Sequence, residues 1–350
     1  MTVMISVRAL TVWLALSVFV AADDRTVSVD HLGDHGILFP PDYHKLNYFP
    51  DEPPAFLSKN PFRFLLVAGN STTLMQGPTG ITSVYQDKKR ILGFYHAEDH
   101  VGMPRVPYNE DIQGGYWSIG VAVSRDHSAT FGEQKQILRA SVPKNKVTNE
   151  HQGIGDVSVI PNASKTFLYA YYTDLTRRKE DERAKIGMAR CPIGAAAKPS
   201  SWQKYFKGEF KERGLGGNES PVVNPPAAFP SEVIGPHVTY VPEWQKYLMV
   251  GNVVAYSDIE KQKGEQGGLF LCQSSDGIEW TEPKVLVVGL SVPHKDREYV
   301  AHPRLYLEKV EANRAEGWLM YCYSPSWGQP KDGRIPHHLA RRHIVLSIAK

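Results

Sequence analysis

Short apolar runs separated by turn residues dominate the chain after residue 79. Two examples are "ILGFYHAED" (91–99) and "TFLYAYYTDL" (166–175), which are rich in the β-branched and aromatic residues that strands prefer. No amphipathic segment keeps helical spacing for three turns. The pattern therefore predicts an all-β protein.

The runs recur as a repeat with a period of about 60 to 75 residues. Each unit reads as a four-stranded meander, and the units span 80–138, 155–210, 236–288 and 302–350. Such units are typical of β-propeller blades. With the strand-like residues before 79, we predict a five-bladed β-propeller, with six blades as the alternative. The last unit ends after its third strand, so an N-terminal strand is expected to supply the fourth and close the ring.

Two turns between third and fourth strands support this reading, "SRDHSATF" (124–131) and "SSDGIEW" (274–280). Both resemble the Asp-box turn of sialidase-like propellers. We expect Asp126 and Asp276 to accept hydrogen bonds from turn N–H groups, and the aromatic residues that follow to pack between sheets.

The ends and the composition narrow the class of protein. Residues 1–22 have one basic residue, an apolar run and small residues at the end, the layout of a signal peptide, which leaves 23–350 as a single domain. We expect a secreted or periplasmic protein with no membrane contact after cleavage. A net charge of +3 gives no reason to expect nucleic-acid binding. The three cysteines, Cys191, Cys272 and Cys322, lie in apolar runs and are expected to be buried thiols.

The long loops all fall on one face of the predicted propeller, where binding sites are usually built. The stretch "HAEDH" (96–100) follows the second strand of its unit, so His96, Glu98 and Asp99 are expected on that face. Asp156, His237 and His302 lie at the starts of first strands, in what look like equivalent positions near the axis. These residues predict a central pocket.

Two carboxyl groups on opposite sides of a sugar are the minimum for acid and base catalysis of glycoside hydrolysis. Candidates on this face are Glu98, Asp99, Asp156 and Glu232. We predict that the remaining contacts to a carbohydrate substrate come from His96, Asp99, His237, Arg304, Trp117 and Tyr116. The competing interpretation is a solvated rim in which Glu98 and Asp99 pair with basic residues. No cofactor is expected, with a structural divalent cation near the axis as the alternative.

The pattern resembles the five-bladed propeller glycosidases: family 43 (arabinanases and xylosidases), family 32 (invertases and levanases) and family 117 (anhydrogalactosidases). The resemblance implies that Asp156 in "GDVS" sets the pKa of its partners and that Glu232 in "SEVIGPH" is the general acid. Glu98 or Asp34 would be the base, and family 117 makes His302 a rival acid. It also implies an inverting mechanism.

Two other functions stay open. The Asp-box-like turns suggest a sialidase-like exo-hydrolase, which would need three arginines around a carboxylate, and Arg105, Arg297 and Arg304 are available. A non-catalytic carbohydrate-binding propeller would use the same face only to bind. The prediction that follows from the sequence is a secreted glycoside hydrolase acting on an oligo- or polysaccharide.

Overall fold

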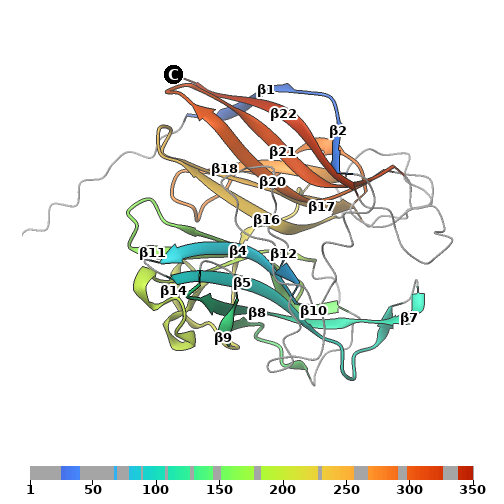
Figure 1. The fold of residues 1–350 in the computed structure, drawn as a ribbon, viewed down its shortest axis with the longest axis vertical. Coiled ribbons are helices and arrows are strands. Elements are labelled where there is room, and N and C mark those ends of the chain that lie inside the picture. The colour runs from blue at the N-terminus through green and yellow to red at the C-terminus, as the bar shows by residue number, and fades with distance from the viewer. Residues whose placement is uncertain are drawn as a thin grey trace, which may run out of the picture.

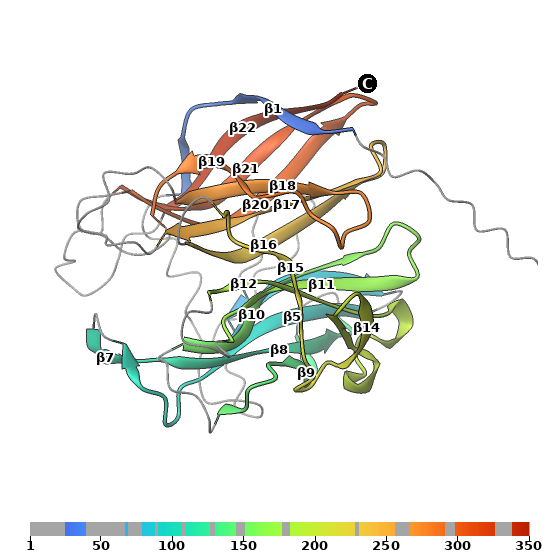
Figure 2. The same ribbon diagram turned by 180° about the vertical axis from the view of Figure 1, so that it is seen from behind.

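Strands make up nearly all of the secondary structure in a computed structural model of the protein (Figures 1 and 2). It describes residues 25–39, 67–68, 79–87, 90–106, 109–126, 130–144, 151–176, 183–227, 231–255, 267–290, 298–325 and 338–349. The helices in these ranges are two single 3-10 turns, η3 (Ile193–Ala195) and η4 (Pro199–Ser201). No helix in the described part of the chain is long and apolar enough to cross a membrane. The all-β prediction is confirmed.

The first sheet is an antiparallel meander with one extra strand. Its order is β4 (Thr79–Asp87), β5 (Arg90–Asp99), β8 (Gly115–Ser124) and β9 (Gly132–Arg139), with β3 (Val67–Ala68) beside β4. The long β5–β8 connection holds a small hairpin, β6 (Arg105–Val106) and β7 (Asn109–Gln113).

The second sheet follows the same plan. Its order is β10 (His151–Pro161), β11 (Phe167–Asp174), β12 (Lys185–Pro192), β13 (Gln203–Phe206) and β14 (Glu209–Arg213), and β15 (Pro221–Val223) also pairs with β12. The start of β10 pairs in parallel with the start of β8, His151 opposite Gly115, and this joins the two sheets at their edge.

The third sheet has four strands in meander order, and the fourth has a four-stranded meander with one extra strand. The third contains β16 (Ser231–Val241), β17 (Lys246–Ala255), β18 (Gly268–Ser274) and β19 (Lys284–Val288). The fourth contains β20 (Tyr299–Val310), β21 (Arg314–Ser324), β22 (His338–Ile348) and, antiparallel to β22, β1 (Val27–Leu32), while β2 (Gly36–Phe39) pairs with β22 further along. The fourth strand of the last sheet thus comes from the N-terminal part of the chain.

The sheets are stacked, with the first two in one half of the molecule and the last two in the other (Figures 1 and 2). Their first strands contact one another in series, β4 with β10, β10 with β16 and β16 with β20. Such serial contacts between first strands are those expected of propeller blades. Residues 40–66 and 69–78, where a further blade is expected, lie outside the described residues, so the blade count and the closure of the ring stay predictions.

Apolar side chains fill the space between successive sheets. Phe94 and Trp202 pack between the first and second, Tyr171 and Phe270 between the second and third, and the cluster between the third and fourth includes Leu319. Both faces of the inner strands are buried, which explains why β11 reads as a nearly continuous apolar run.

The predicted turn chemistry is confirmed. Asp126 accepts a hydrogen bond from the Thr130 N–H (2.9 Å), and Asp276 accepts from two successive turn N–H groups at 2.8 and 2.9 Å. Trp280 then packs edge-on against Tyr171, with ring centroids 5.6 Å apart. The three cysteines are free and buried, as expected.

Candidate active site

A β-bulge interrupts the first strands β10, β16 and β20 at the same place. The register shifts between Gly155 and Ser158, between Ile234 and His237, and between Ala301 and Arg304. The first bulged residue has left-handed backbone torsion in each strand: Asp156 (φ 48°), Gly235 (φ 62°) and His302 (φ 53°). A strained non-glycine backbone of this kind often marks a functional position.

This register corrects one prediction from the sequence. Asp156 and His302 are equivalent, as expected, but the third equivalent residue is Gly235 and not His237. The strands also begin earlier than predicted, so these residues lie within strands and not at their starts. His237 follows the bulge and is equivalent to Ser158 and Arg304.

The second strand of each sheet holds the bulge of the next sheet. The Gly235 N–H donates to Thr173 Oγ1 (2.8 Å), and the His302 N–H donates to Asn252 Oδ1 (3.1 Å). The Asp156 amide nitrogen lies 3.1 Å from His96 Nδ1, which can accept its N–H only when the ring is neutral. Asn252 also donates to the Val300 carbonyl at 2.9 Å. The bonds from Thr173 and Asn252 fix the backbone of the bulges at Gly235 and His302.

A second set of hydrogen bonds between sheets lies just beyond the bulge. Ser83 Oγ accepts from the Val159 N–H (2.9 Å) and Ser158 Oγ accepts from the Val238 N–H (3.1 Å). His237 continues the set, because its Nδ1 accepts from the Leu305 N–H at 3.3 Å. Burial and the charge of a nearby arginine lower the pKa of His237 to about 3, so it stays neutral and keeps the lone pair that this bond needs.

The stretch that ends β5 forms a chain of ionisable groups with the β10 bulge. His96 lies between two carboxylates, with Nε2 3.1 Å from Glu98 Oε1 and Nδ1 3.2 Å from Asp156 Oδ1. Thr173 donates to Asp156 Oδ2 at 3.1 Å. At the other end, His100 Nε2 lies 3.3 Å from Glu98 Oε2. Four of the five residues thus carry side chains that can gain or lose a proton.

His96, Asp156 and Glu98 stabilise one another's charged forms. Burial alone would lower the pKa of His96, but its hydrogen bonds to Asp156 and Glu98 and their charges raise it to about 10. Burial likewise opposes ionisation of Asp156, yet His96, the charge of His302 and the Thr173 hydroxyl lower its pKa to about 2. Burial opposes ionisation of Glu98 as well, but the hydrogen bond to His96 and the His96 charge outweigh it and lower the pKa of Glu98. At neutral pH an imidazolium therefore lies between two carboxylates.

Glycine and tryptophan shape the surroundings of His96. The Trp117 ring lies 4.5 Å from the imidazole, centroid to centroid. A Cβ on Gly155 would lie 2.6 Å from His96 Nδ1, and one on Gly153, whose φ is 104°, would lie 2.2 Å from the Trp117 carbonyl oxygen. A side chain at Gly155 would displace His96, and one at Gly153 would displace the Trp117 backbone.

His302 and Arg304 approach Asp156 from β20. Solvent reaches the His302 side chain, but the protein around it still desolvates the ring and lowers its pKa despite the Asp156 charge. Arg304 is half-buried, and its Nη1 donates to the Pro303 carbonyl at 2.9 Å. Among the described residues, no carboxylate lies within 4 Å of the Arg304 guanidinium.

Other predicted site residues have different surroundings. Glu232 is 1% exposed, in β16 on the loop side of the bulge. Asp99 pairs with Lys144 (N···O 2.6 Å), as the solvated-rim interpretation expects. Tyr116 is 3% exposed and donates to the Val142 carbonyl, so its ring belongs to the core and cannot stack on a sugar. Asp34 is exposed beside the outermost strands of the last sheet.

Sequence reasoning missed Thr173 and Asn252, which hold the bulged residues. Both are fully buried polar residues in otherwise apolar strands, and that was the signal available in "YYTDL" and "VGNVV". Within the described ranges, no group of three or more His, Cys, Asp or Glu side chains is placed to hold a metal ion.

No protein-family model and no curated protein matches the sequence. Three similar solved structures are an N-acetylgalactosamine deacetylase from F. plautii with blood group B trisaccharide, a family 117 glycoside hydrolase from Zobellia galactanivorans, and a Cellvibrio cellulosa alpha-L-arabinanase with arabinohexaose. Their identities are 10%, 13% and 11%, and their TM-scores 0.41, 0.40 and 0.40. The alignments cover 75%, 73% and 73% of this chain and 70%, 67% and 70% of the others. Two of the groups that the sequence resembles are thus among the similar structures, but at these values the function has to be argued from this chain's own residues.

Proposed function

We propose that the protein is a secreted glycoside hydrolase that acts on an oligo- or polysaccharide at the His96–Asp156 cluster and needs no cofactor. The observation that carries the proposal is the placement of two ionised carboxylates, Glu98 and Asp156, on either side of one imidazolium beside the exposed His302. Hydrolysis of a glycosidic bond needs a base, a charge that stabilises the positive transition state, and an acid for the leaving group.

The pKa values suggest how these roles divide. Glu98 and Asp156 both have lowered pKa values, so they suit the base and the stabilising charge and cannot serve as acid near neutral pH. We assign the base to Glu98. Asp156 keeps His96 charged and places negative charge under the sugar ring. The acid is then His302 or Glu232, and His302 is favoured because solvent reaches it. Separate acid and base groups fit an inverting reaction.

This division predicts an acidic pH optimum. His302 has a pKa below its usual 6.5, so the fraction that carries a proton grows as the pH falls. Asp156 stays ionised down to about pH 2 and Glu98 to below its usual pKa. The rate should rise as the pH drops below 6.5 and fall once Glu98 takes up a proton. A log(kcat/KM) profile that is flat from pH 5 to 9 would rule out His302 as acid.

A carbohydrate-binding protein without catalysis is the second candidate. The observation that favours it is that both carboxylates are already engaged in ion pairs with His96. The sialidase-like alternative has less support, because Arg105 is exposed in the long loop. Arg297 lies outside the described residues.

The first experiment is a screen of the purified mature protein against a panel of glycans, with release of reducing ends as the readout. Asp156→Asn should abolish release without lowering the Tm. Asp276→Asn is the matched control: it changes an aspartate in a turn between strands, so it should lower the Tm and leave kcat unchanged. Binding without release, equal in wild type and Asp156→Asn, would favour the binding protein.

A further inference from the structure

The set of hydrogen bonds beyond the bulge is broken in the last sheet. Ser83, Ser158 and His237 each use a side-chain lone pair to accept an N–H from the next sheet. The equivalent residue of β20 is Arg304, and a guanidinium has five N–H donors and no lone pair to accept with. Breaks in a local structural rule tend to mark functional positions.

The donors of Arg304 are largely unused within the fold. Its hydrogen bond among the described residues goes to Pro303, the residue before it in the chain. Asp156 acts on the Arg304 charge only from beyond contact distance, and its own carboxylate oxygens are bonded to His96 and Thr173. A half-buried cation without a contacting anion is costly unless a ligand supplies the anion.

The bulged residue of the same strand also differs from its equivalents. Asp156 is bonded through its side chain and Gly235 has none, whereas the His302 imidazole is open to solvent and has no side-chain hydrogen bond among the described residues. His302 and Arg304 lie two residues apart on β20, so this strand presents a cation and a second hydrogen-bonding group beside Asp156.

We propose that Arg304, beside His302, forms a subsite for an anionic group on the sugar, either the carboxylate of a uronic acid or a sulfate ester. The inference rests on the proposed function and narrows its substrate class to acidic glycans. A planar guanidinium binds such groups through two parallel hydrogen bonds, which an ammonium cannot reproduce. The Asp156 oxygens are bonded to His96 and Thr173, so the Arg304 N–H groups are left for the ligand.

The test measures binding of monosaccharides by calorimetry at low and high salt, without any need for cleavage. The probes are glucuronate, glucose 6-sulfate and neutral glucose. We expect one of the two anionic sugars to bind at least tenfold more tightly than glucose, and the preferred one identifies the anion. Arg304→Gln should remove this preference and Arg304→Lys should keep only part of it. Arg314→Gln, which breaks an exposed pair with Glu316, is the control and should change nothing.

Equal affinity for the three sugars, or the same affinity in wild type and Arg304→Gln, would overturn the proposal. If Arg304→Gln does not fold, as judged from its Tm, Arg304→Lys carries the test, and unchanged selectivity in that variant at high and low salt would overturn the two-bond recognition.

Cleavage assays separate this inference from the hydrolase itself. Release from neutral oligosaccharides only, at equal rates in wild type and Arg304→Lys, would leave the hydrolase standing and remove the anionic subsite. Arg304-dependent binding of an anionic sugar, with no release from any glycan, would support the subsite and contradict the hydrolase.

Discussion

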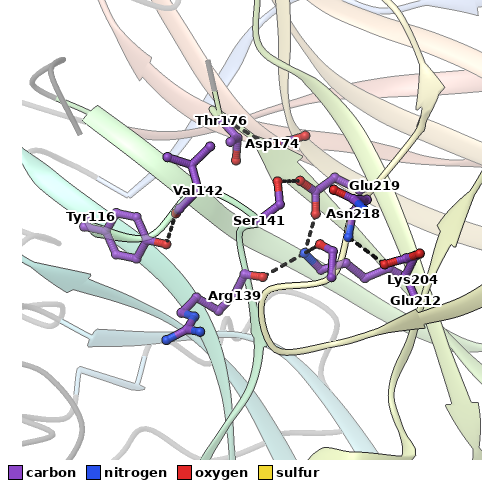
Figure 3. Close-up of polar contacts among 11 residues, drawn as sticks. Tyr116, Arg139, Ser141, Val142, Asp174, Thr176, Lys204, Glu212, Asn218 and Glu219 are labelled. Carbon is purple, nitrogen blue, oxygen red and sulfur yellow. Dashed lines mark hydrogen bonds and ion pairs between the residues drawn. The ribbon is translucent and has the colours of Figure 1, made fainter. Parts of the chain in front are cut away.

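Two groups of buried charges differ in how completely the fold satisfies them. In the first, Lys204 and Glu219 are 0% and 1% exposed and form an ion pair (Figure 3). Lys204 also donates to the Arg139 and Gly217 carbonyls at 2.7 and 3.0 Å, so each of its three N–H groups has an acceptor, and Ser141 donates to the second carboxylate oxygen of Glu219.

The second group is the His96–Asp156 cluster, which is closed on one side and open on the other. Thr173 and His96 satisfy Asp156 from within, but His302 is exposed and Arg304 has no contacting anion among the described residues. The comparison teaches that burial of charge does not identify a site. A charge whose every bond is made inside the fold stabilises the protein, whereas a charge with bonds left to make is placed to act on a ligand.

The largest expected effect is on the closed pair. Lys204→Met should lower the free energy of unfolding by about 3–5 kcal/mol, because it leaves Glu219 buried and unpaired. Urea denaturation measures this, and the folded variant should keep its activity. Lys211→Met is the control: its pair with Glu209 is exposed, so the change should be small. If Lys204→Met lowers the free energy of unfolding no more than Lys211→Met does, water must reach Glu219.

The next effect is the pH dependence of stability from the open cluster. His96 has a pKa of about 10 in the folded protein and 6.5 in the unfolded chain. Its contribution is fully present below pH 6.5 and is lost as the pH rises through 10, a loss on the order of 5 kcal/mol at most. Neutral His96 can accept the Asp156 N–H, which reduces the loss. His96→Gln should flatten stability against pH between 6.5 and 10, and an unchanged slope would place the titration elsewhere.

A smaller effect is expected at Thr173, which both supports the Asp156 charge and holds the Gly235 backbone. Thr173→Val keeps the shape of the side chain but removes the hydroxyl that serves Asp156 and Gly235, and should cost about 1–2 kcal/mol of stability. The pKa of Asp156, followed by carboxyl NMR, should rise. Thr173→Ser keeps the hydroxyl and should leave that pKa where it was. Equal pKa values in all three proteins would show that Thr173 does not support the Asp156 charge.

Much of the fold could be predicted from the sequence, because meander strands and Asp-box turns are encoded locally. The proximity of "HAEDH" to Asp156 also followed, since both lie on the long-loop face. The two-residue bulges could not be predicted: they depend on pairing with a neighbouring strand, and they shift His237 out of equivalence with His302. Tyr116 and Trp117 are adjacent, so they face opposite sides of β8, and the sequence did not tell which side was the core.

The pairing of β1 with β22 sets the order in which the protein can be completed. Val27 lies opposite Ile348, so β1 has no partner until the distant strand β22 has been made. The other three sheets can form from neighbouring segments as they emerge during synthesis. The last sheet closes across the whole chain length, and such long-range contacts form slowly. Until β22 is made, β1 is an unpaired edge that can associate with other chains. The yield of folded protein should therefore depend most on this step, because chaperones would protect the edge and stalled synthesis would leave it exposed.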